Sequence, residues 1–342
     1  MDLAALNAIA EKMVTPGKGI LAADESTGTI KKRFDTIGLE STEASRRDYR
    51  EMLFRADDAM RNYVSGVILY EETLYQTCAD GNATPLVNLI ERAGAVPGIK
   101  VDKGTKPLPG FPGETITEGL DGLGERLERD YSQGARFAKW RAVIDVGDAA
   151  PTWGAIKANA HALARYAALC QAARIVPIVE PEVLMDGGHD IARCEAVTRL
   201  TLNTVFQELF EQRVALEGMV LKPNMVVSGK KSGLTDTADT VAERTLAVLK
   251  ACVPASVPGI AFLSGGQSDE AATANLDAMN KMGPLPWKLT FSFGRALQSA
   301  PLKAWGGRPE NVAAAQRAFV HRARMNSLAS LGQWEGKLER AA

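Results

Sequence analysis

Short apolar runs rich in β-branched residues recur along the chain, and each predicts a buried strand. The runs occupy residues 19–26, 65–72, 96–102, 137–146, 174–183, 218–226, 259–267 and 287–297. Stretches with helical periodicity lie between them, as at residues 152–173 and 193–212. Strands that alternate with helices indicate an α/β fold with a parallel sheet. Eight such units predict a single-domain (β/α)8 barrel, the TIM barrel.

The segments outside this pattern are consistent with one domain over residues 1–342. Residues of about 1–15 predict a docking helix, whose apolar face would consist of Leu3, Leu6, Ile9 or Ala10, and Met13. Residues 103–122 are rich in proline and glycine and predict a long loop after the third strand rather than a linker. The helical periodicity of apolar residues weakens after about residue 325. We therefore expect a C-terminal tail over about 325–342, with residues 339–342 loosely ordered.

Charged residues gather at the carboxyl ends of the predicted strands. A single charged residue there is usually a solvated loop residue, but several at the same end of one barrel converge on one rim. In barrel enzymes that rim carries the active site. The residues concerned are Asp24, Glu71, Lys100, Lys139, Arg141, Glu180, Glu182, Lys222 and Arg295.

Composition narrows the classes of function. The chain has 40 basic and 41 acidic residues, so it carries no bulk charge that would attract nucleic acid or an anionic membrane. No apolar run is long enough to span a bilayer, and the amino-terminal residues do not form a signal peptide. The four cysteines are widely spaced without a CxxC pair, which is typical of reduced packing residues. We therefore expect a cytoplasmic protein without nucleic-acid or membrane partners.

Lys222 lies in the apolar segment VLKPNM and is the first candidate for chemistry. A lysine ammonium is costly to bury, so such a position favours the neutral, nucleophilic amine, above all beside another cation. Lys139, which shares a strand face with Arg141, is the expected cationic neighbour. A salt-bridged structural lysine is the alternative, and taken alone it is the commoner case.

Glu180 and Glu182 occupy alternate positions of one strand and so share a face. Two close carboxylates make it easier for one of them to hold a proton, as acid and base catalysis of imine formation requires. The alternative is a ladder of ion-paired glutamates, whose basic partners would be Lys139, Arg141 and Lys222. Both interpretations gather the same residues.

Two groups of residues could bind phosphate. The last two strands end in Ser264, Gly265 and Gly266, and in Ser292, Gly294 and Arg295. Glycine lets backbone N–H groups approach an anion, arginine donates in a fork, and this is the usual phosphate site of the architecture. The opposite side of the rim offers a second group, consisting of Ser26, Thr29, Lys100 and Arg33. Two anion sites around one amine indicate a bisphosphate.

Two other patterns do not indicate a binding site. The glycines of GKGILA, residues 17–22, precede a strand, whereas a dinucleotide-binding fingerprint follows one. His161, His189 and His321 lack the spacing of metal ligands. We therefore expect neither a metal nor a cofactor.

Several long blocks, in the same order, resemble class I fructose-1,6-bisphosphate aldolases from about residue 17 to residue 330. The blocks are KGILAADESTGTI, GVILYEETLYQ, GIKVDKG, GETITEGLDGL, FAKWR, IVPIVEPE, LKPNM, FLSGGQS, TFSFGRAL and LKAWGG. The resemblance implies a metal-independent lyase that cleaves fructose 1,6-bisphosphate to dihydroxyacetone phosphate and glyceraldehyde 3-phosphate, in glycolysis and gluconeogenesis. It also implies a homotetramer.

The resemblance assigns roles residue by residue. Lys222 would form the imine, Glu180 would shuttle protons, and Asp24 would act at the substrate hydroxyl when the carbon–carbon bond breaks. Lys139 would handle charge beside the imine, with Glu182 as its electrostatic partner, and Arg141 would bind the substrate as a bridge between the two phosphate ends. The phosphate nearest the ketone would bind to Ser264, Gly265, Gly266, Ser292, Gly294 and Arg295. The other phosphate would bind to Ser26, Lys100, Arg33 and Arg46.

This chain departs from the family at two places. Thr29 replaces a serine of the animal members and keeps the hydroxyl. The animal members end in a tyrosine that assists proton exchange, whereas this chain has no tyrosine after Tyr166. Another tail group, Glu180 or water would have to take that role.

Two rival functions remain open from the sequence. One is a different Schiff-base lyase, such as a transaldolase or an aldolase for monophosphates. The other is a binding or scaffold protein that keeps the barrel without its activity.

Overall fold

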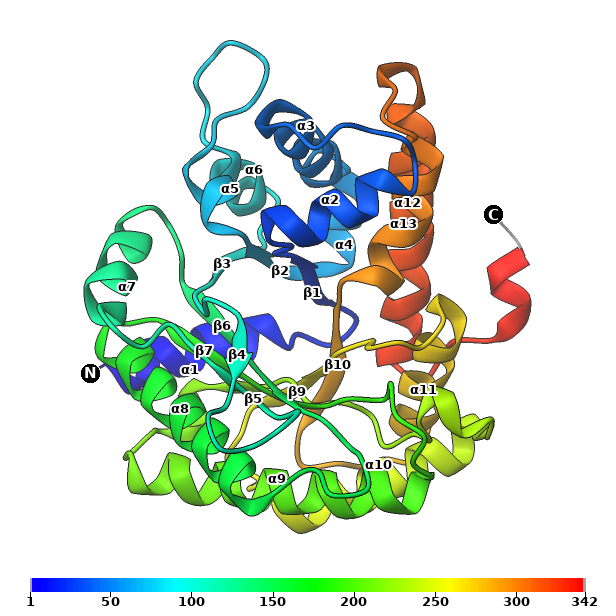
Figure 1. Cartoon of the computed structure of the whole chain (residues 1–342). Helices are drawn as coiled ribbons and strands as arrows, with labels where there is room; N and C mark the ends of the chain where they lie inside the picture. Colours follow the sequence, from blue (N-terminus) through cyan, green and yellow to red (C-terminus); the bar gives the residue numbers. More distant parts are fainter. Residues whose placement is uncertain (1, 341–342) are drawn as a thin grey trace.

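Eight parallel strands close into a barrel in the computed structural model, which describes residues 2–340 (Figure 1). Around the barrel the order is β1, β10, β9, β8, β7, β6, β3 and β2. The predicted (β/α)8 barrel is therefore confirmed. The strands are β1 (Gly19–Ala23), β2 (Val64–Leu69), β3 (Val96–Lys100), β6 (Phe137–Ile144), β7 (Val176–Val183), β8 (Val220–Leu221), β9 (Gly259–Phe262) and β10 (Lys288–Phe293).

Most of the strands end earlier than the apolar runs predict. The clearest case is β8, which has two residues where residues 218–226 were expected. Pro223 has no N–H to donate to a neighbouring strand, so the regular ladder stops there. The chain still follows the barrel, since Lys222 N donates to Val179 O and Leu263 N donates to Pro223 O. The carboxyl ends of several runs are therefore loops, as at Asp24, Lys222 and Ser264, whereas Lys139 and Glu180 remain within β6 and β7.

Helices surround the barrel on all sides. Figure 1 shows α8, α9 and α10 along one side, with α3, α12 and α13 on the opposite side. The helices are α1 (Leu3–Met13), α2 (Thr27–Asp35), α3 (Glu43–Phe54), α4 (Asp57–Asn62), α5 (Glu71–Tyr75), α6 (Leu86–Arg92), α7 (Leu123–Ser132), α8 (Trp153–Ala172), α9 (Ile191–Glu211), α10 (Ala238–Cys252), α11 (Asp269–Lys281), α12 (Arg295–Trp305) and α13 (Val312–Ser330). Short 3-10 helices are η1 (Leu216–Gly218), η2 (Lys230–Ser232), η3 (Pro309–Asn311) and η4 (Gly336–Arg340). No helix among residues 2–340 combines the length and apolar character needed to cross a membrane.

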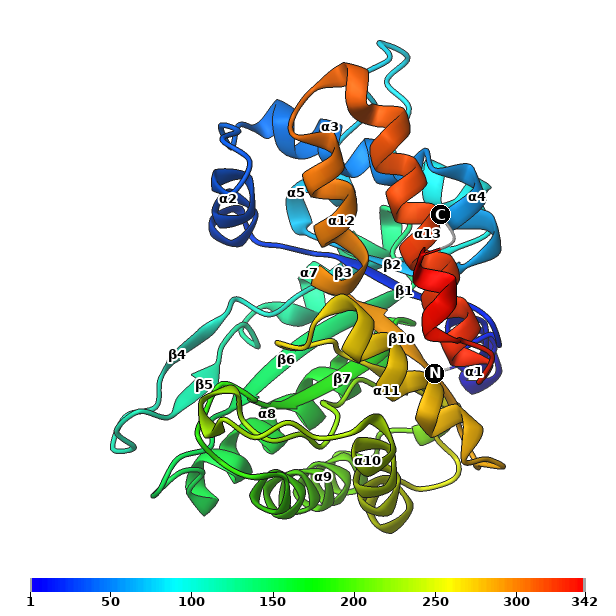
Figure 2. The same ribbon diagram turned by 90° about the vertical axis from the view of Figure 1, so that its right-hand side faces the viewer.

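The amino-terminal helix α1 closes one end of the barrel. Asp2 caps it by accepting a hydrogen bond from Ala5 N, and its buried residues are Leu6, Ala10 and Met13. These side chains pack against residues near the starts of the strands, including Val96 and Val176. Leu3 lies on the edge of the predicted face and is 39% exposed. Because α1 covers the amino ends of the strands, the opposite end is left for a site (Figure 2).

The long loop after β3 contains a small antiparallel ribbon. Its strands are β4 (Thr105–Pro107) and β5 (Thr115–Thr117). Asn159 on α8 fixes the ribbon, since Asn159 Nδ2 donates to Thr115 O. The ribbon projects from the barrel on the same side as α2 in Figure 2. The segment belongs to the barrel rim and does not link two domains.

The predicted start of the C-terminal tail is wrong, because the last helix extends beyond it. α13 continues to Ser330, so the tail begins about five residues later than residue 325. Loss of amphipathic periodicity misled the prediction, because α13 is buried over much of its surface and includes Arg322, Asn326 and Ser327 among its buried residues. Glu339 is also held in place, by Arg322 and His321. Of the residues expected to be loose, 341 and 342 lie outside the described part of the chain.

The barrel interior has no space for a side chain at Gly98 on β3. A Cβ atom added there would lie 2.2 Å from the ring of Phe137, a fully buried side chain on the neighbouring strand. We expect Gly98→Ala to lower the free energy of unfolding by about 1–3 kcal/mol, because overpacking forces the backbone or ring to move. Urea denaturation measures this.

Gly124 on α7 provides the matched control. A Cβ atom at that position meets nothing within 4 Å. Gly124→Ala should therefore raise the free energy of unfolding by up to about 1 kcal/mol, as alanine replaces glycine in a helix. Equal effects from the two substitutions would show that the barrel interior adapts to Gly98→Ala.

Candidate active site

A cavity of about 1210 Å³ opens at the carboxyl ends of the barrel strands. Most of the predicted site residues line it, although they come from distant parts of the sequence. They are Asp24, Ser26, Thr29, Arg33, Lys100, Lys139, Arg141, Glu180, Glu182, Lys222, Ser264, Gly265, Ser292, Gly294 and Arg295. Convergence of these residues on one rim follows from the parallel barrel, which brings all the carboxyl ends together.

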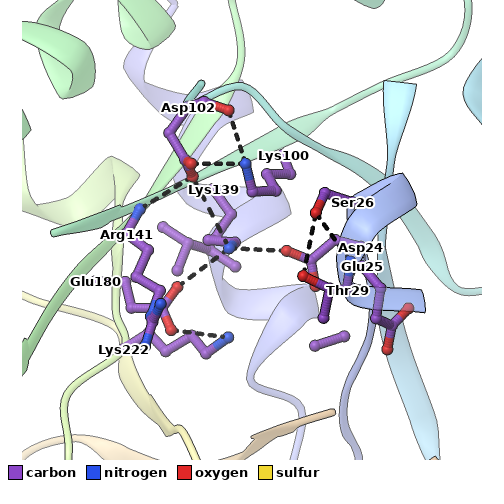
Figure 3. A network of polar contacts seen from close by, with 12 residues as sticks. Asp24, Glu25, Ser26, Thr29, Lys100, Asp102, Lys139, Arg141, Glu180 and Lys222 are labelled. Atoms are coloured by element: carbon purple, nitrogen blue, oxygen red, sulfur yellow. Dashed lines mark hydrogen bonds and ion pairs between the residues drawn. The ribbon is translucent and has the colours of Figure 1, made fainter. Parts of the chain in front are cut away.

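Lys139 is the centre of an ion network at the floor of the cavity (Figure 3). Its Nζ lies 2.7 Å from Asp24 Oδ2 and 3.5 Å from Glu180 Oε2. Lys222 Nζ lies 3.3 Å from the other oxygen of Glu180. The predicted cationic neighbour of Lys222 is therefore present, but the carboxylate of Glu180 stands between the two amines. Glu180 can exchange protons with a group at either nitrogen.

The strands explain this placement. Alternate residues of β6 face the barrel interior, so Lys139 and Arg141 point the same way. In the parallel register, Lys139 pairs with Lys100 on β3, and Arg141 pairs with Glu180 on β7. Lys222 follows β8 directly, and 4% of its surface is exposed. An amine buried to this degree is shielded from bulk water and accessible only from the cavity.

The network fixes the charge of Asp24. Burial raises its pKa, but the positive charges of Lys139 and Lys222 outweigh burial and lower the pKa below the ordinary 3.8. For Lys139 the opposite balance holds, since burial lowers its pKa while Asp24, Glu180 and Asp102 raise it well above 10.5. At neutral pH, Asp24 is therefore a carboxylate that can accept a proton, and Lys139 is a fixed positive charge.

Glu182 does not form a shared acidic pair with Glu180. It accepts a hydrogen bond from Arg141 Nε, while Glu180 contacts the two lysines. Burial lowers the pKa of Arg141, but the charge of Glu182 more than offsets this and the net shift is upward. The ion-paired arrangement considered from the sequence is the observed one, and it assembles the same constellation.

The loops after β9 and β10 form one anion-binding region. Gly294 precedes the first turn of α12, whose free N–H groups and dipole favour an anion. The hydroxyl of Ser292 is buried beside this turn and has no hydrogen-bond partner among the described residues. Arg295 donates to Gly265 O, which ties the two loops together. Donors are thus available where phosphate binding was predicted.

A second polar region lies at the start of α2. Ser26 caps this helix by accepting from Thr29 N, and the hydroxyls of Ser26 and Thr29 lie 3.1 Å apart. Lys100 also lines the cavity, and its amine is bound to Asp102 Oδ1 at 2.6 Å.

Arg33 lies closer to the first region than predicted. It donates to Glu25 at 2.5 Å, and a methyl group placed at Gly294 would be 3.6 Å from its Nη2. Its guanidinium therefore stands beside the start of α12, in the region that was assigned to the phosphate nearest the ketone.

Two predicted ligands do not line the cavity. Arg46 on α3 donates to Glu72 at 2.9 Å and to the carbonyl oxygen of Ser41 at 3.1 Å, so its guanidinium is already committed. The N–H of Gly266 donates to Met185 Sδ at 3.1 Å and is likewise occupied. The position of these residues does not support their assignment to phosphate binding.

The three histidines are dispersed in the structure as in the sequence. His161 contacts Glu208 and His321 contacts Glu339, and neither lies at the cavity. Within residues 2–340, no group of three or more His, Cys, Asp or Glu side chains is placed to hold a metal ion.

Comparison with known proteins agrees with the geometry. The family model for class I fructose-bisphosphate aldolase, described as glycolytic, matches residues 5–342. The chain belongs to the class I fructose-bisphosphate aldolase family. A probable class 1 fructose-bisphosphate aldolase of Xanthomonas campestris is 53% identical over 98% of this chain and 100% of its own length. The cytosolic fructose-bisphosphate aldolase 4 of Arabidopsis thaliana is 55% identical over 94% of this chain and 81% of its own length.

A solved aldolase structure shares the fold closely. The fructose-bisphosphate aldolase of Plasmodium falciparum, in a complex with TRAP and a small-molecule inhibitor, superposes with a TM-score of 0.94 at 49% identity. The match covers 98% of this chain and 96% of the other. The resemblance found in the sequence is thus confirmed, and the chain is a lyase of the aldolase class.

Asp102 is a residue of this aldolase site that the sequence reasoning missed. It lies two residues after the end of β3, within GIKVDKG, and its charge at a strand end is the signal that could have identified it. Its carboxylate accepts from Lys100, from Gly104 N at 3.1 Å and from Arg141 N at 3.3 Å. Lys139 Nζ lies 4.0 Å away. Asp102 therefore joins the ends of β3 and β6 and balances two lysines.

Replacing this carboxylate should cost stability. We expect Asp102→Asn to lower the free energy of unfolding by about 1–3 kcal/mol, because charged hydrogen bonds to buried partners are lost. Urea denaturation measures the change. Asp148→Asn, at an exposed position after β6, serves as the control and should be neutral. A neutral Asp102→Asn would mean that Asn can hold both strand ends.

Proposed function

We propose that this chain cleaves fructose 1,6-bisphosphate reversibly to dihydroxyacetone phosphate and glyceraldehyde 3-phosphate through an imine on Lys222. The observation that carries the proposal is the buried Lys222 amine, 3.3 Å from Glu180 and exposed only to a cavity with polar regions at two sides. Lys222 Nζ would attack the C2 carbonyl, and loss of water would give a protonated imine. This imine accepts the electrons of the breaking C3–C4 bond.

Asp24 is proposed as the base for bond cleavage. Its carboxylate would take the proton of the C4 hydroxyl as the C3–C4 electron pair moves toward the imine nitrogen and leaves an enamine. Lys139, at 2.7 Å, keeps Asp24 ionised, so that its carboxylate is free to take this proton. A general base must be ionised to take the proton, and Asp24 meets that condition at neutral pH.

Glu180 is proposed as the proton carrier for imine formation. Dehydration of the carbinolamine needs a proton delivered to its hydroxyl, and Glu180 lies next to Lys222, on which the carbinolamine forms. Glu182 would act indirectly by fixing Arg141 at the cavity wall. Hydrolysis of the imine uses the same groups in reverse.

The two polar regions are proposed to hold the two phosphates. Ser264, Gly265, Ser292, Gly294 and Arg295 would bind the phosphate nearest the ketone. Ser26, Thr29 and Lys100 would bind the other one. Arg33 lies beside Gly294 and would contribute to the ketone-side region. Holding both ends orients the reacting carbons and lowers the entropic part of the barrier.

Proton exchange at the enamine carbon needs a group near the cavity. None of the described tail residues lines the cavity, so a tail side chain is poorly placed for this role. Of the candidates considered, Glu180 and water remain, and Glu180 lies next to Lys222.

Borohydride trapping tests the proposal. Reduction in the presence of dihydroxyacetone phosphate should leave a stable adduct, and peptide mass mapping should place it on Lys222. Comparing cleavage of the bisphosphate with cleavage of fructose 1-phosphate separates a bisphosphate aldolase from a monophosphate one. An unmodified Lys222, or an adduct on a different lysine, would contradict the assignment.

We further propose a cytoplasmic homotetramer with a role in glycolysis. The glycolytic description of the family model supports the role, and the cytosolic relatives of Arabidopsis thaliana and the cytoplasmic isozyme of Pisum sativum support the location. The tetramer rests on resemblance to the family alone. Sedimentation equilibrium measures the mass of the assembly directly.

A further inference from the structure

A buried arginine connects the C-terminal tail to α11 and α12, the helices that follow the loops after β9 and β10. Arg322 lies on α13 with 4% of its surface exposed. Its guanidinium donates to Asp269 O at 3.1 Å, to Thr273 Oγ1 at 2.7 Å and to Ala296 O at 3.4 Å. It also donates to Glu339 Oε2 at 2.6 Å. Glu339 is thus the carboxylate that balances a charge buried among α11, α12 and α13.

The tail is fixed by contacts of Glu339 and Trp334. The second oxygen of Glu339 accepts from Trp334 Nε1 at 3.1 Å, and His321 Nε2 lies 3.1 Å from the first. Trp334 N donates to Asp277 on α11 at 2.8 Å. Burial raises the pKa of Glu339, but the hydrogen bond and charge of Arg322 outweigh it, so Glu339 is ionised at neutral pH.

The helices that Arg322 contacts, α11 and α12, each begin just after one of the two loops that form the anion region proposed for the phosphate nearest the ketone. α11 begins at Asp269, shortly after the loop that carries Ser264 and Gly265. α12 begins at Arg295, and Ala296 is in its first turn.

Gln267 strengthens the connection between α11 and the loop before it. Gln267 donates to Ser264 O at 3.2 Å and accepts from Asn275 on α11 at 2.6 Å. A shift of α11 or α12 would therefore displace the donors of the anion region.

We propose that Arg322 and Glu339 are positioning residues for the phosphate nearest the ketone, and that the C-terminal tail acts on this enzyme through them. The proposal rests on the phosphate assignment of the proposed function. Neither residue lines the cavity, so neither touches the substrate. With Glu339 in place, Arg322 holds the first turns of α11 and α12. Without its carboxylate, the buried guanidinium loses its counter-charge, and both turns can relax away from the anion.

The experiment compares Glu339→Gln with Glu335→Gln in the full chain. Glu335 is in the same tail, but it is exposed and pairs with the exposed Lys337. We expect Glu339→Gln to raise KM for fructose 1,6-bisphosphate, and Kd for inorganic phosphate, by about 3- to 10-fold. kcat should stay within about twofold, because the catalytic groups do not move. Glu335→Gln should match the wild type.

A phosphate-free ketone separates positioning from general damage. Borohydride trapping with dihydroxyacetone should be equal in Glu339→Gln and the wild type, whereas trapping with dihydroxyacetone phosphate should need more ligand. Glu339→Asp keeps the charge and should restore part of the affinity. Thermal unfolding of each variant checks that it is folded.

Several results would overturn the proposal. Among them are an unchanged KM and phosphate affinity in Glu339→Gln, an equal loss with dihydroxyacetone, or a loss in kcat alone. Failure of the proposed function would look different, because Lys222 would then not be trapped in the wild type. Binding of inorganic phosphate would still report whether Glu339 positions the anion region.

Discussion

Lys222→Met is expected to lower kcat for fructose 1,6-bisphosphate cleavage by on the order of 10⁴-fold or more, because no other amine can form the imine in its place. Methionine is apolar and similar in length, so it suits a position that is 4% exposed. Glu180 keeps its contact with Lys139 when Lys222 is removed. Binding of the bisphosphate should therefore persist while cleavage and borohydride trapping are lost. A coupled assay of product and equilibrium binding measure the two effects.

Lys288→Met is the matched control, since Lys288 is an exposed strand lysine at the start of β10, far from the carboxyl end. It should leave the rate unchanged. Cleavage that persists in Lys222→Met, or that a chelator abolishes in the wild type, would rule out the imine on Lys222. Transfer of the adduct to Lys139 would show that the neighbouring amine is the nucleophile.

The barrel could be predicted because each strand is marked in the sequence by a local run of apolar residues. Apolar runs of β-branched residues form β1, β2 and β10 close to where the sequence places them. The exceptions have local causes, such as Pro223, which ends the ladder of β8. The end of α13 was missed because a helix buried on several sides has no amphipathic period to read.

The site was predictable as a set of residues but not as a set of contacts. A parallel barrel brings strand ends together whatever their sequence separation, so Lys139, Glu180 and Lys222 could be grouped in advance. Which side chains contact each other depends on their distances in the folded protein, and these cannot be read from the spacing of residues along the sequence. Arg46 therefore proved to be occupied by Glu72, and Arg33 to lie beside Gly294. The tail contact between Glu339 and Arg322 was invisible for the same reason.

Asp24→Asn should separate imine formation from bond cleavage. Without the carboxylate, no base is placed for the C4 hydroxyl, and kcat for cleavage should fall by about 10²- to 10⁴-fold. Lys222 and Glu180 remain as they are, so dihydroxyacetone phosphate should still be trapped by borohydride on Lys222. Lys139 keeps its contacts with Glu180 and Asp102, which limits the structural damage.

The control for this variant is Asp35→Asn, at an exposed position of α2 paired with Lys31. It should not change the rate. Because the lysines hold the pKa of Asp24 below 3.8, the wild-type carboxylate stays ionised as pH falls toward about 5. Any loss of cleavage above that pH must then come from a different group. If Asp24→Asn cleaves at the wild-type rate, Asp24 is not the base at the C4 hydroxyl. If the folded variant fails to trap dihydroxyacetone phosphate, Asp24 is also needed to form the imine.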